Sequence, residues 1–226
     1  MTTSFRLFVL VLAAVLPGGL RNRLLGACFG WHLDPGARVS RWALVLCDGL
    51  VMAPRTTIGA LTVVKGLAAL EMGEAASIGR LNWISGFPLD NRSSFSHVEG
   101  RMPALILGRH SAITNRHLID CTDTVHIGEF ATFAGFRSQI ITHSIDIAGN
   151  RQHCKPVRIG AYAFVGTGSV VLGGASVPDH SVVGAGSVVV SALEGTHALY
   201  AGAPARFVKP LTPACKYFLR REGAVQ

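Results

Sequence analysis

The sequence predicts an all-β fold, a parallel β-solenoid, and a six-residue repeat is the main observation that predicts it. Every sixth position between 159 and 189 holds a β-branched aliphatic residue, and a second set of positions, in step with the first, holds only small residues. The aliphatic set is Ile159, Val165, Val171, Val177, Val183 and Val189, and the small set is Ala163, Ser169, Ala175, Ser181 and Ser187.

A spacing of six favours strands over a helix. On an α-helix each residue advances by about 100°, so positions six apart fall on different faces. On a strand, where side chains alternate, every sixth residue points to the same side. A single strand over residues 159–189 would far exceed the usual length of about 3–10 residues. The chain is therefore expected to bend at regular intervals while keeping its aliphatic residues inward.

Weaker copies of the repeat extend the predicted solenoid over residues 32–210. The step of six recurs upstream, with two-residue slips between the runs. The upstream runs are Ile58–Leu70, Met72–Ile84, Leu107–Val125 and Ile127–Phe133. Two stretches rich in turn-forming and polar residues, near 85–104 and 144–156, interrupt the repeat and are expected to be loops inserted between coils. Loops on a rigid scaffold are common places for functional residues.

The two ends of the chain lie outside the predicted solenoid. Residues 1–31 are apolar and basic and are expected to be helical, and residues 211–226 form a C-terminal tail. The apolar run Leu7–Leu16 is shorter than the roughly 20 residues that span a bilayer, and the Pro17–Gly19 stretch after it is a poor signal-peptide cleavage region. The N-terminal segment either caps the open end of the solenoid or lies on an anionic membrane surface.

Composition and charge exclude several classes of protein. With 49% apolar and 15% charged residues, most of the 226-residue chain is not disordered. Five scattered cysteines without a C-x-x-C pair argue against a disulfide scaffold and a structural zinc site, and favour a reducing compartment. The net charge of +8 is accompanied by no nucleic-acid-binding motif, so no nucleic-acid partner is expected.

The repeat resembles that of the hexapeptide-repeat acyltransferases, the family that includes galactoside, maltose and capsule-sugar acetyltransferases. The resemblance is close over residues 105–210 and looser over 50–84. It is carried by Thr142-His143 and the loop after it, by Val157–Val189, by the Gly184–Ser187 turn and by the string Ala201–Arg206. It implies a left-handed parallel β-helix, acyl transfer from a CoA thioester, no metal, and a homotrimer with its sites between subunits.

The resemblance implies that His143 is the general base of a direct transfer. Histidine suits this role because its unperturbed pKa lies near neutrality. Asp146 either orients the imidazole or is a solvated loop residue. Asn115, His117 and Asp120 either line the acceptor pocket or satisfy backbone groups at the corners of the solenoid. The remaining histidines considered are expected to be surface or corner residues: His110, His126, His153, His180 and His197.

The resemblance also implies a binding site for acetyl-CoA or another acyl-CoA. Ala185 and Gly186 match the turn whose backbone meets the pantetheine, and Thr167 matches a small polar position in the preceding coil. Arg206 and Lys209 match basic positions near the phosphates. The sequence departs from the family at two positions. Phe164 replaces a frequent Trp and keeps an aromatic wall for the cofactor, whereas Ser191 replaces a frequent Lys and removes a partner for the phosphates.

The expected activity is an acyl-CoA-dependent O-acyltransferase, most simply an acetyltransferase, acting in polysaccharide biosynthesis. Its acceptor would be a sugar, a glycan or a lipid-linked saccharide. The protein is expected in the cytoplasm, with or without peripheral attachment to the inner face of the membrane. The alternative is a non-catalytic β-helix that serves as an assembly or regulatory subunit. A β-helix carbonic anhydrase is disfavoured because no two histidines are five positions apart.

Overall fold

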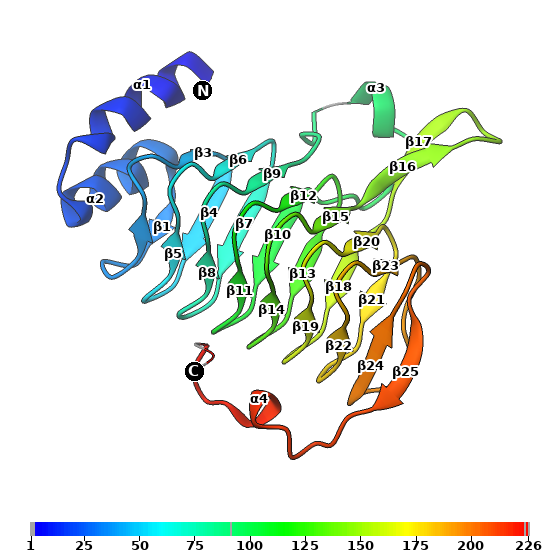
Figure 1. Cartoon of the computed structure of the whole chain (residues 1–226). Helices are drawn as coiled ribbons and strands as arrows, with labels where there is room; N and C mark the ends of the chain where they lie inside the picture. Colours follow the sequence, from blue (N-terminus) through cyan, green and yellow to red (C-terminus); the bar gives the residue numbers. More distant parts are fainter. Residues whose placement is uncertain (1–2, 91, 224, 226) are drawn as a thin grey trace.

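The computed structural model describes residues 3–90, 92–223 and 225. It shows a parallel β-helix with two helices at its N-terminal end and a C-terminal segment that folds back along the solenoid (Figure 1). The N-terminal helices are α1 (Thr3–Ala14) and α2 (Gly18–Phe29). The expected all-β, left-handed parallel β-helix with a short helical segment is confirmed.

Each coil contributes one short strand to each of three sheets. The first sheet holds β1 (His32–Leu33), β4 (Gly49–Met52), β7 (Ala69–Met72), β10 (Ala104–Leu107), β13 (Val125–Ile127), β18 (Val157–Ile159) and β21 (Ser176–Val177). The second sheet holds β2 (Arg38–Val39), β5 (Thr57–Ile58), β8 (Ser77–Ile78), β11 (Ala112–Ile113), β14 (Thr132–Phe133), β19 (Phe164–Val165), β22 (Val182–Val183), β24 (Ala198–Ala201) and β25 (Arg206–Pro210). The third sheet holds β3 (Leu44–Leu46), β6 (Val63–Lys65), β9 (Trp83–Ser85), β12 (Leu118–Asp120), β15 (Gln139–Ile141), β20 (Val170–Leu172) and β23 (Val188–Val189).

The six-residue repeat lines the core of the solenoid. All six aliphatic residues between 159 and 189 are at most 1% exposed. Val165 pairs with Val183 and Val171 with Val189, so equivalent residues of successive coils lie directly above one another. The small residues Ser169, Ser181 and Ser187 are fully buried beside them, where a narrow interior leaves room only for short side chains.

The two-residue slips in the repeat correspond to longer coils. Ile58 pairs with Ile78, a coil of twenty residues, whereas the later coils take eighteen. The additional residues lie in first-sheet strands such as β7, where Leu70 and Met72 both point into the core. Such a strand has two inward residues separated by one outward residue. In the sequence, the second inward residue shifts the six-residue repeat by two positions.

The two insertions leave the solenoid at the same place, the corner where the chain passes from the third sheet to the first (the third–first corner). The insertion after β9 contains the short helix α3 (Arg92–Phe95). The insertion after β15 is an antiparallel hairpin of β16 (His143–Asp146) and β17 (Arg151–Cys154), where the sequence predicted a polar loop. Figure 1 shows both projecting on the same side of the solenoid.

Helix α2 caps the first coil. The Arg21 guanidinium is 5% exposed and donates to the Val39 and Ser40 carbonyl oxygens, at 2.5 and 3.2 Å. The Asn22 side-chain amide donates to the Ala37 carbonyl oxygen at 3.0 Å, and Leu25 is fully buried. These contacts give α2 the capping role that covers the open end of a solenoid. They leave α1 outside, packed mainly on α2.

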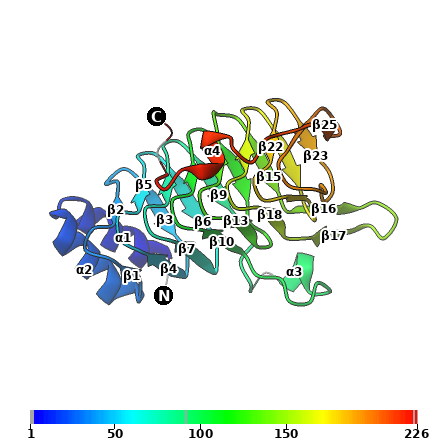
Figure 2. The ribbon, with the colours of Figure 1, turned by 90° about the horizontal axis from the view of Figure 1, so that it is seen from below.

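The C-terminal tail lies along the second sheet and carries α4 (Lys216–Leu219), as Figure 2 shows. The Tyr217 hydroxyl donates to the Ala163 carbonyl oxygen at 3.2 Å, and the Gly223 amide donates to His110 Nδ1 at 3.2 Å. The tail crosses a column of stacked rings with centroids 4.6 to 5.0 Å apart, one from each coil. The column is His110, Phe130, Tyr162, His180 and His197.

Candidate active site

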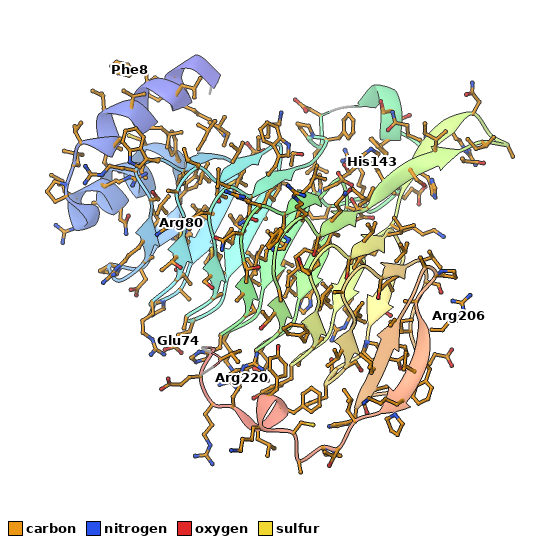
Figure 3. All side chains as sticks on the ribbon, viewed as in Figure 1. Phe8, Glu74, Arg80, His143, Arg206 and Arg220 are labelled. Atoms are coloured by element: carbon orange, nitrogen blue, oxygen red, sulfur yellow. The ribbon has the colours of Figure 1, made fainter. Side chains whose placement is uncertain are left out.

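His143 stands at the base of the hairpin, where the chain leaves the third–first corner (Figure 3). Its Nδ1 lies 2.8 Å from Oδ2 of Asp120, the last residue of β12. Strand β12 pairs with β15, so the carboxylate and the imidazole come from neighbouring coils. The Asp120 side chain is 9% exposed, while that of His143 is 34% exposed. The arrangement presents a half-buried imidazole on a buried carboxylate.

Asp120 is held as a carboxylate by several donors. Oδ2 also accepts from the Thr142 amide at 2.8 Å and from the Thr142 hydroxyl at 2.6 Å, and Oδ1 accepts from the Thr122 hydroxyl at 2.6 Å. Burial raises the pKa of Asp120, but the hydrogen bonds from His143, Thr122 and Thr142 outweigh it and lower that pKa to about 2. Asp120 is therefore an acceptor at neutral pH.

An acceptor-only carboxylate fixes the tautomer of the imidazole. His143 Nδ1 carries the proton and donates to Asp120, which leaves Nε2 with its lone pair. Nε2 has no hydrogen-bond partner among the described residues. The hydrogen bond to Asp120 raises the pKa of His143 above its ordinary value, against the opposing effect of burial. The pair has the arrangement of a general base and its orienting group.

Two phenylalanines of the first insertion flank the imidazole. The rings of Phe87 and Phe95 meet the His143 ring edge to face, with centroids 5.5 and 6.5 Å away. They also contact each other, with centroids 5.2 Å apart. The insertion near 85–104 therefore forms an apolar wall beside the base. The sequence offered no signal for this contact beyond aromatic residues within a polar stretch.

Arg101 fastens that insertion to the corner. It is 8% exposed, and its guanidinium donates to the carbonyl oxygens of Phe87 at 2.6 Å, Pro88 at 2.8 Å and Thr122 at 3.1 Å. The same group lies over the Phe95 ring, 5.0 Å from its centroid. Arg101 thus links the aromatic wall to Thr122, a hydrogen-bond donor to Asp120. Sequence reasoning did not find Arg101.

Asp146 lies on the hairpin and engages it instead of the imidazole. Its Oδ1 accepts from the Gly149 amide at 3.1 Å, and its Oδ2 lies 3.5 Å from Arg151 Nε on the opposite strand. The partner of His143 Nδ1 is Asp120 and not Asp146. The structure therefore supports the interpretation of Asp146 as a solvated loop residue over that of an orienting group.

Asn115 and His117 lie in the coil corner and hold backbone groups. Asn115 Oδ1 accepts from the Arg80 amide at 2.7 Å. His117 is 2% exposed, with its Nε2 2.9 Å from the Thr114 hydroxyl and its Nδ1 accepting from the Ser138 amide at 3.2 Å. Burial lowers the pKa of His117 to about 4. The ring of His117 therefore lies inside the solenoid.

The residues expected to bind CoA lie away from His143. Thr167, Ala185 and Gly186 are exposed at the corner between the second and third sheets, where the Gly186 amide donates to the Thr167 carbonyl oxygen at 2.9 Å. Gly186 has φ +69°, and a Cβ there would meet nothing within 4 Å, so this corner is open to an approaching ligand. The width of the third sheet separates this corner from that of His143, since about five residues of chain, roughly 15 Å, cross from one corner to the other.

The remaining predicted CoA contacts lie on the second sheet. Arg206 and Lys209 are exposed on β25, at the C-terminal end of the solenoid, where Figure 3 labels Arg206. The Phe164 ring meets the Tyr217 ring edge to face, with centroids 5.7 Å apart, so the tail covers part of this aromatic side chain. No group of three or more His, Cys, Asp or Glu side chains suited to a metal ion lies within residues 3–90, 92–223 and 225.

Comparison with solved structures finds this architecture in a mutant of AntD, an N-acyltransferase from Bacillus cereus, in complex with dTDP-4-amino-4,6-dideoxyglucose and coenzyme A. The two chains are 14% identical, with a TM-score of 0.54 over 85% of this chain and 89% of that one. This chain has the hexapeptide-repeat fold. The hexapeptide-repeat acetyltransferase VCA0836 from Vibrio cholerae is also similar, with 18% identity and a TM-score of 0.47 over 92% of this chain and 90% of that one. No protein-family model and no curated protein matches the sequence.

Proposed function

We propose that the protein is an acyl-CoA-dependent O-acyltransferase, with acetyl-CoA as its simplest donor and a sugar, glycan or lipid-linked saccharide as its acceptor. The observation that carries the proposal is the Asp120–His143 pair, in which a buried carboxylate holds a half-buried imidazole whose Nε2 has no hydrogen-bond partner among the described residues. The hexapeptide-repeat fold supports it, because the similar AntD structure contains coenzyme A and a nucleotide sugar.

In the proposed reaction His143 Nε2 takes the proton of the acceptor hydroxyl as its oxygen attacks the thioester carbonyl. The C–O bond forms, the C–S bond breaks, and the proton passes from Nε2 to the leaving sulfur, so the products are the ester and free CoA. Asp120 stabilises the imidazolium during the transfer. The acyl-CoA supplies an activated acyl group.

A direct transfer agrees with the state of the nearby thiols. Cys154 faces His143 across the hairpin, but burial raises its pKa to about 11, so it remains a thiol at neutral pH. Cys121 is fully buried, and burial raises its pKa well above the ordinary value. Neither residue has the thiolate character of a nucleophile that forms an acyl-enzyme.

A homotrimer with its sites between subunits explains the distance between the two halves of the site. The base lies at one edge of the third sheet, and the corner with Thr167 and Gly186 lies at the other. A neighbouring copy can place its open corner beside His143. The outer face of the third sheet supports such a contact, since Trp83 and Leu118 expose large apolar side chains there. Within this scheme Thr167, Ala185 and Gly186 hold the pantetheine, and Arg206 and Lys209 hold the phosphates.

The proposed location is the cytoplasm. All five cysteines are free, as expected in a reducing compartment. Within the described part of the chain, no helix combines the length and the hydropathy needed to cross a bilayer.

The proposal is tested by thiol release from acetyl-CoA with a panel of sugars, nucleotide sugars, amino sugars and lipid-linked glycans. We expect His143→Ala to lower the rate by about 10² to 10⁴, the usual contribution of a general base. His153→Ala, which changes a histidine of the same hairpin, is the matched control and should keep the rate. Transfer that survives His143→Ala would refute the assigned base. No release with any acceptor, together with no CoA binding in calorimetry, would favour a non-catalytic assembly subunit.

A further inference from the structure

The outward face of α1 is apolar and uncovered. Leu7, Phe8, Val11, Leu12 and Val15 are 40% to 81% exposed, and Phe8 points away from the solenoid (Figure 3). The opposite side of the helix buries Val9 and Ala13 against the rest of the protein. A contiguous apolar face on a described surface indicates a partner that removes it from water.

The position of α1 relates this face to the candidate active site. The Arg6 guanidinium donates to the Cys47 carbonyl oxygen at 3.1 Å and pairs with Asp48 at 3.0 Å. Cys47 and Asp48 connect β3 to β4, which is the third–first corner of the first coil. Helix α1 therefore lies on the same corner as both insertions and His143.

The hairpin carries a second group of exposed apolar side chains at this corner. Ile145 is 60% exposed and Ile147 is 85% exposed, close to the hairpin turn. Leu89, in the first insertion, is half exposed. Three segments distant in the sequence thus present apolar side chains along one edge of the molecule.

Exposed cations accompany the apolar side chains. Lys65, which ends β6, and Lys155, which follows β17, are both exposed at the third–first corner. The whole chain carries a net charge of +8. Apolar side chains flanked by cations match the boundary between acyl chains and anionic head groups, where an interfacial helix lies flat.

We infer that the third–first corner is a membrane-binding edge that rests on an anionic lipid surface, with the outer face of α1 in the interface and the hairpin tip as a second contact. The edge holds His143 close to the lipid surface. Resting on the proposed function, this geometry assigns the acceptor to the class of membrane-anchored saccharides.

The test uses the full chain and vesicles of phosphatidylcholine with and without phosphatidylglycerol. We expect the protein to float with the anionic vesicles, and to be released by added salt because exposed charges are screened. Val11→Glu combined with Val15→Glu should lower the partition at least about tenfold, since charged side chains cannot enter the acyl region. Leu219→Glu, at an exposed leucine of the tail, is the matched control and should float like the wild type.

A second measurement places α1 directly. The indole introduced by Phe8→Trp should shift its emission to the blue on anionic vesicles and be quenched by brominated lipids. Failure of the wild type to float would overturn the inference, as would equal flotation of the Val11→Glu, Val15→Glu protein. A change of oligomeric state in that variant without a change in flotation would identify α1 as a protein interface and also overturn it. None of these readouts depends on acyl transfer, so they are independent of the proposed function.

Discussion

Asp120 Oδ2 accepts a hydrogen bond of 2.8 Å from His143 Nδ1, across two neighbouring coils of the solenoid. The carboxylate is buried and the imidazole is half buried, so the pair joins the interior of the β-helix to its surface. Five further donors hold the same carboxylate: the backbone and hydroxyl groups of Thr122 and Thr142, and the His143 amide. This contact fixes the orientation of the imidazole from the solenoid, at the first residue of the hairpin strand β16.

Asp120→Asn should lower the transfer rate by roughly 10²-fold or more, because the amide no longer fixes the tautomer or stabilises the imidazolium. The measurement is kcat/KM by thiol release. Asp146→Asn changes an acid of the same hairpin strand as His143, which pairs with Arg151, and should leave the rate within about threefold. Equal losses in the two variants would contradict the role given to Asp120.

The pH dependence of kcat/KM should show an acid limb with its midpoint above pH 6.5, because Asp120 raises the pKa of His143 and the base works only when neutral. Asp120→Asn removes the cause of that shift, so the midpoint should move to lower pH even though the rate falls. An NMR titration of His143 in the free protein reports the same pKa. A midpoint of the acid limb at higher pH in Asp120→Asn than in the wild type would show that a group other than Asp120 stabilises the imidazolium.

The stability of the fold should depend on Asp120 at low pH. Its pKa is about 2 in the folded protein and near 3.8 when unfolded, so the folded state holds the carboxylate more strongly. The stabilisation, about 2 kcal/mol, is complete above pH 3.8 and is lost as the pH falls toward 2. Urea unfolding at pH 5 and pH 2.5 should therefore show a smaller difference between the wild type and Asp120→Asn at the lower pH.

Loosening the first insertion should impair acceptor binding. Arg101→Gln removes the guanidinium bonds to the Phe87 and Pro88 carbonyl oxygens, so we expect KM for the acceptor to rise about tenfold with a smaller change in kcat. Phe87→Ala, which keeps Arg101, should raise the acceptor KM in the same way. This variant separates the effect of losing the aromatic ring from the effect of loosening the insertion. Arg158→Gln, at an exposed arginine of the first sheet, is the control. An unchanged acceptor KM in Phe87→Ala would remove the wall from the acceptor site.

A site shared between subunits should show complementation. His143→Ala removes the base, and Ala185→Trp blocks the open corner, so each variant alone should be inactive. Mixed trimers would pair an intact His143 with an intact corner at about one quarter of their interfaces. Thiol release should therefore recover to roughly that fraction after subunit exchange. No recovery, in mixtures shown to contain mixed trimers, would place both halves in one chain.

The sequence predicted the solenoid well because the positions of its repeat are the positions that fill the core. Ile159 and the five residues in step with it are all buried, and the slip between Leu70 and Met72 is a real feature of β7. His143 was found only through resemblance, since spacing alone does not distinguish it from other histidines. Asp120 was among the candidates, but its contact depends on the stacking of β12 under β15, which a single sequence does not reveal.

The insertion near 85–104 was predicted, but its contacts were not, for a related reason. Phe87 and Arg101 lie in a stretch without periodicity, and their contacts with His143 and Thr122 bridge separate coils. The hairpin was missed because its strands are short and mostly polar, so no alternation of apolar residues marked them. Thr167 and Gly186 lie across the third sheet from His143. The six-residue repeat predicts corners at regular intervals, but it does not say which of the three corners of a coil a given residue occupies.

Both insertions leave the β-helix from a single corner, so the other two corners repeat from coil to coil without interruption. A chain built this way can exchange residues 86–103 or 144–155 for a longer or shorter segment while the hydrogen-bonded ladders stay in register. The two insertions can therefore change in length and sequence at little risk to folding, because the residues of the core and those of the insertions belong to different stretches of sequence.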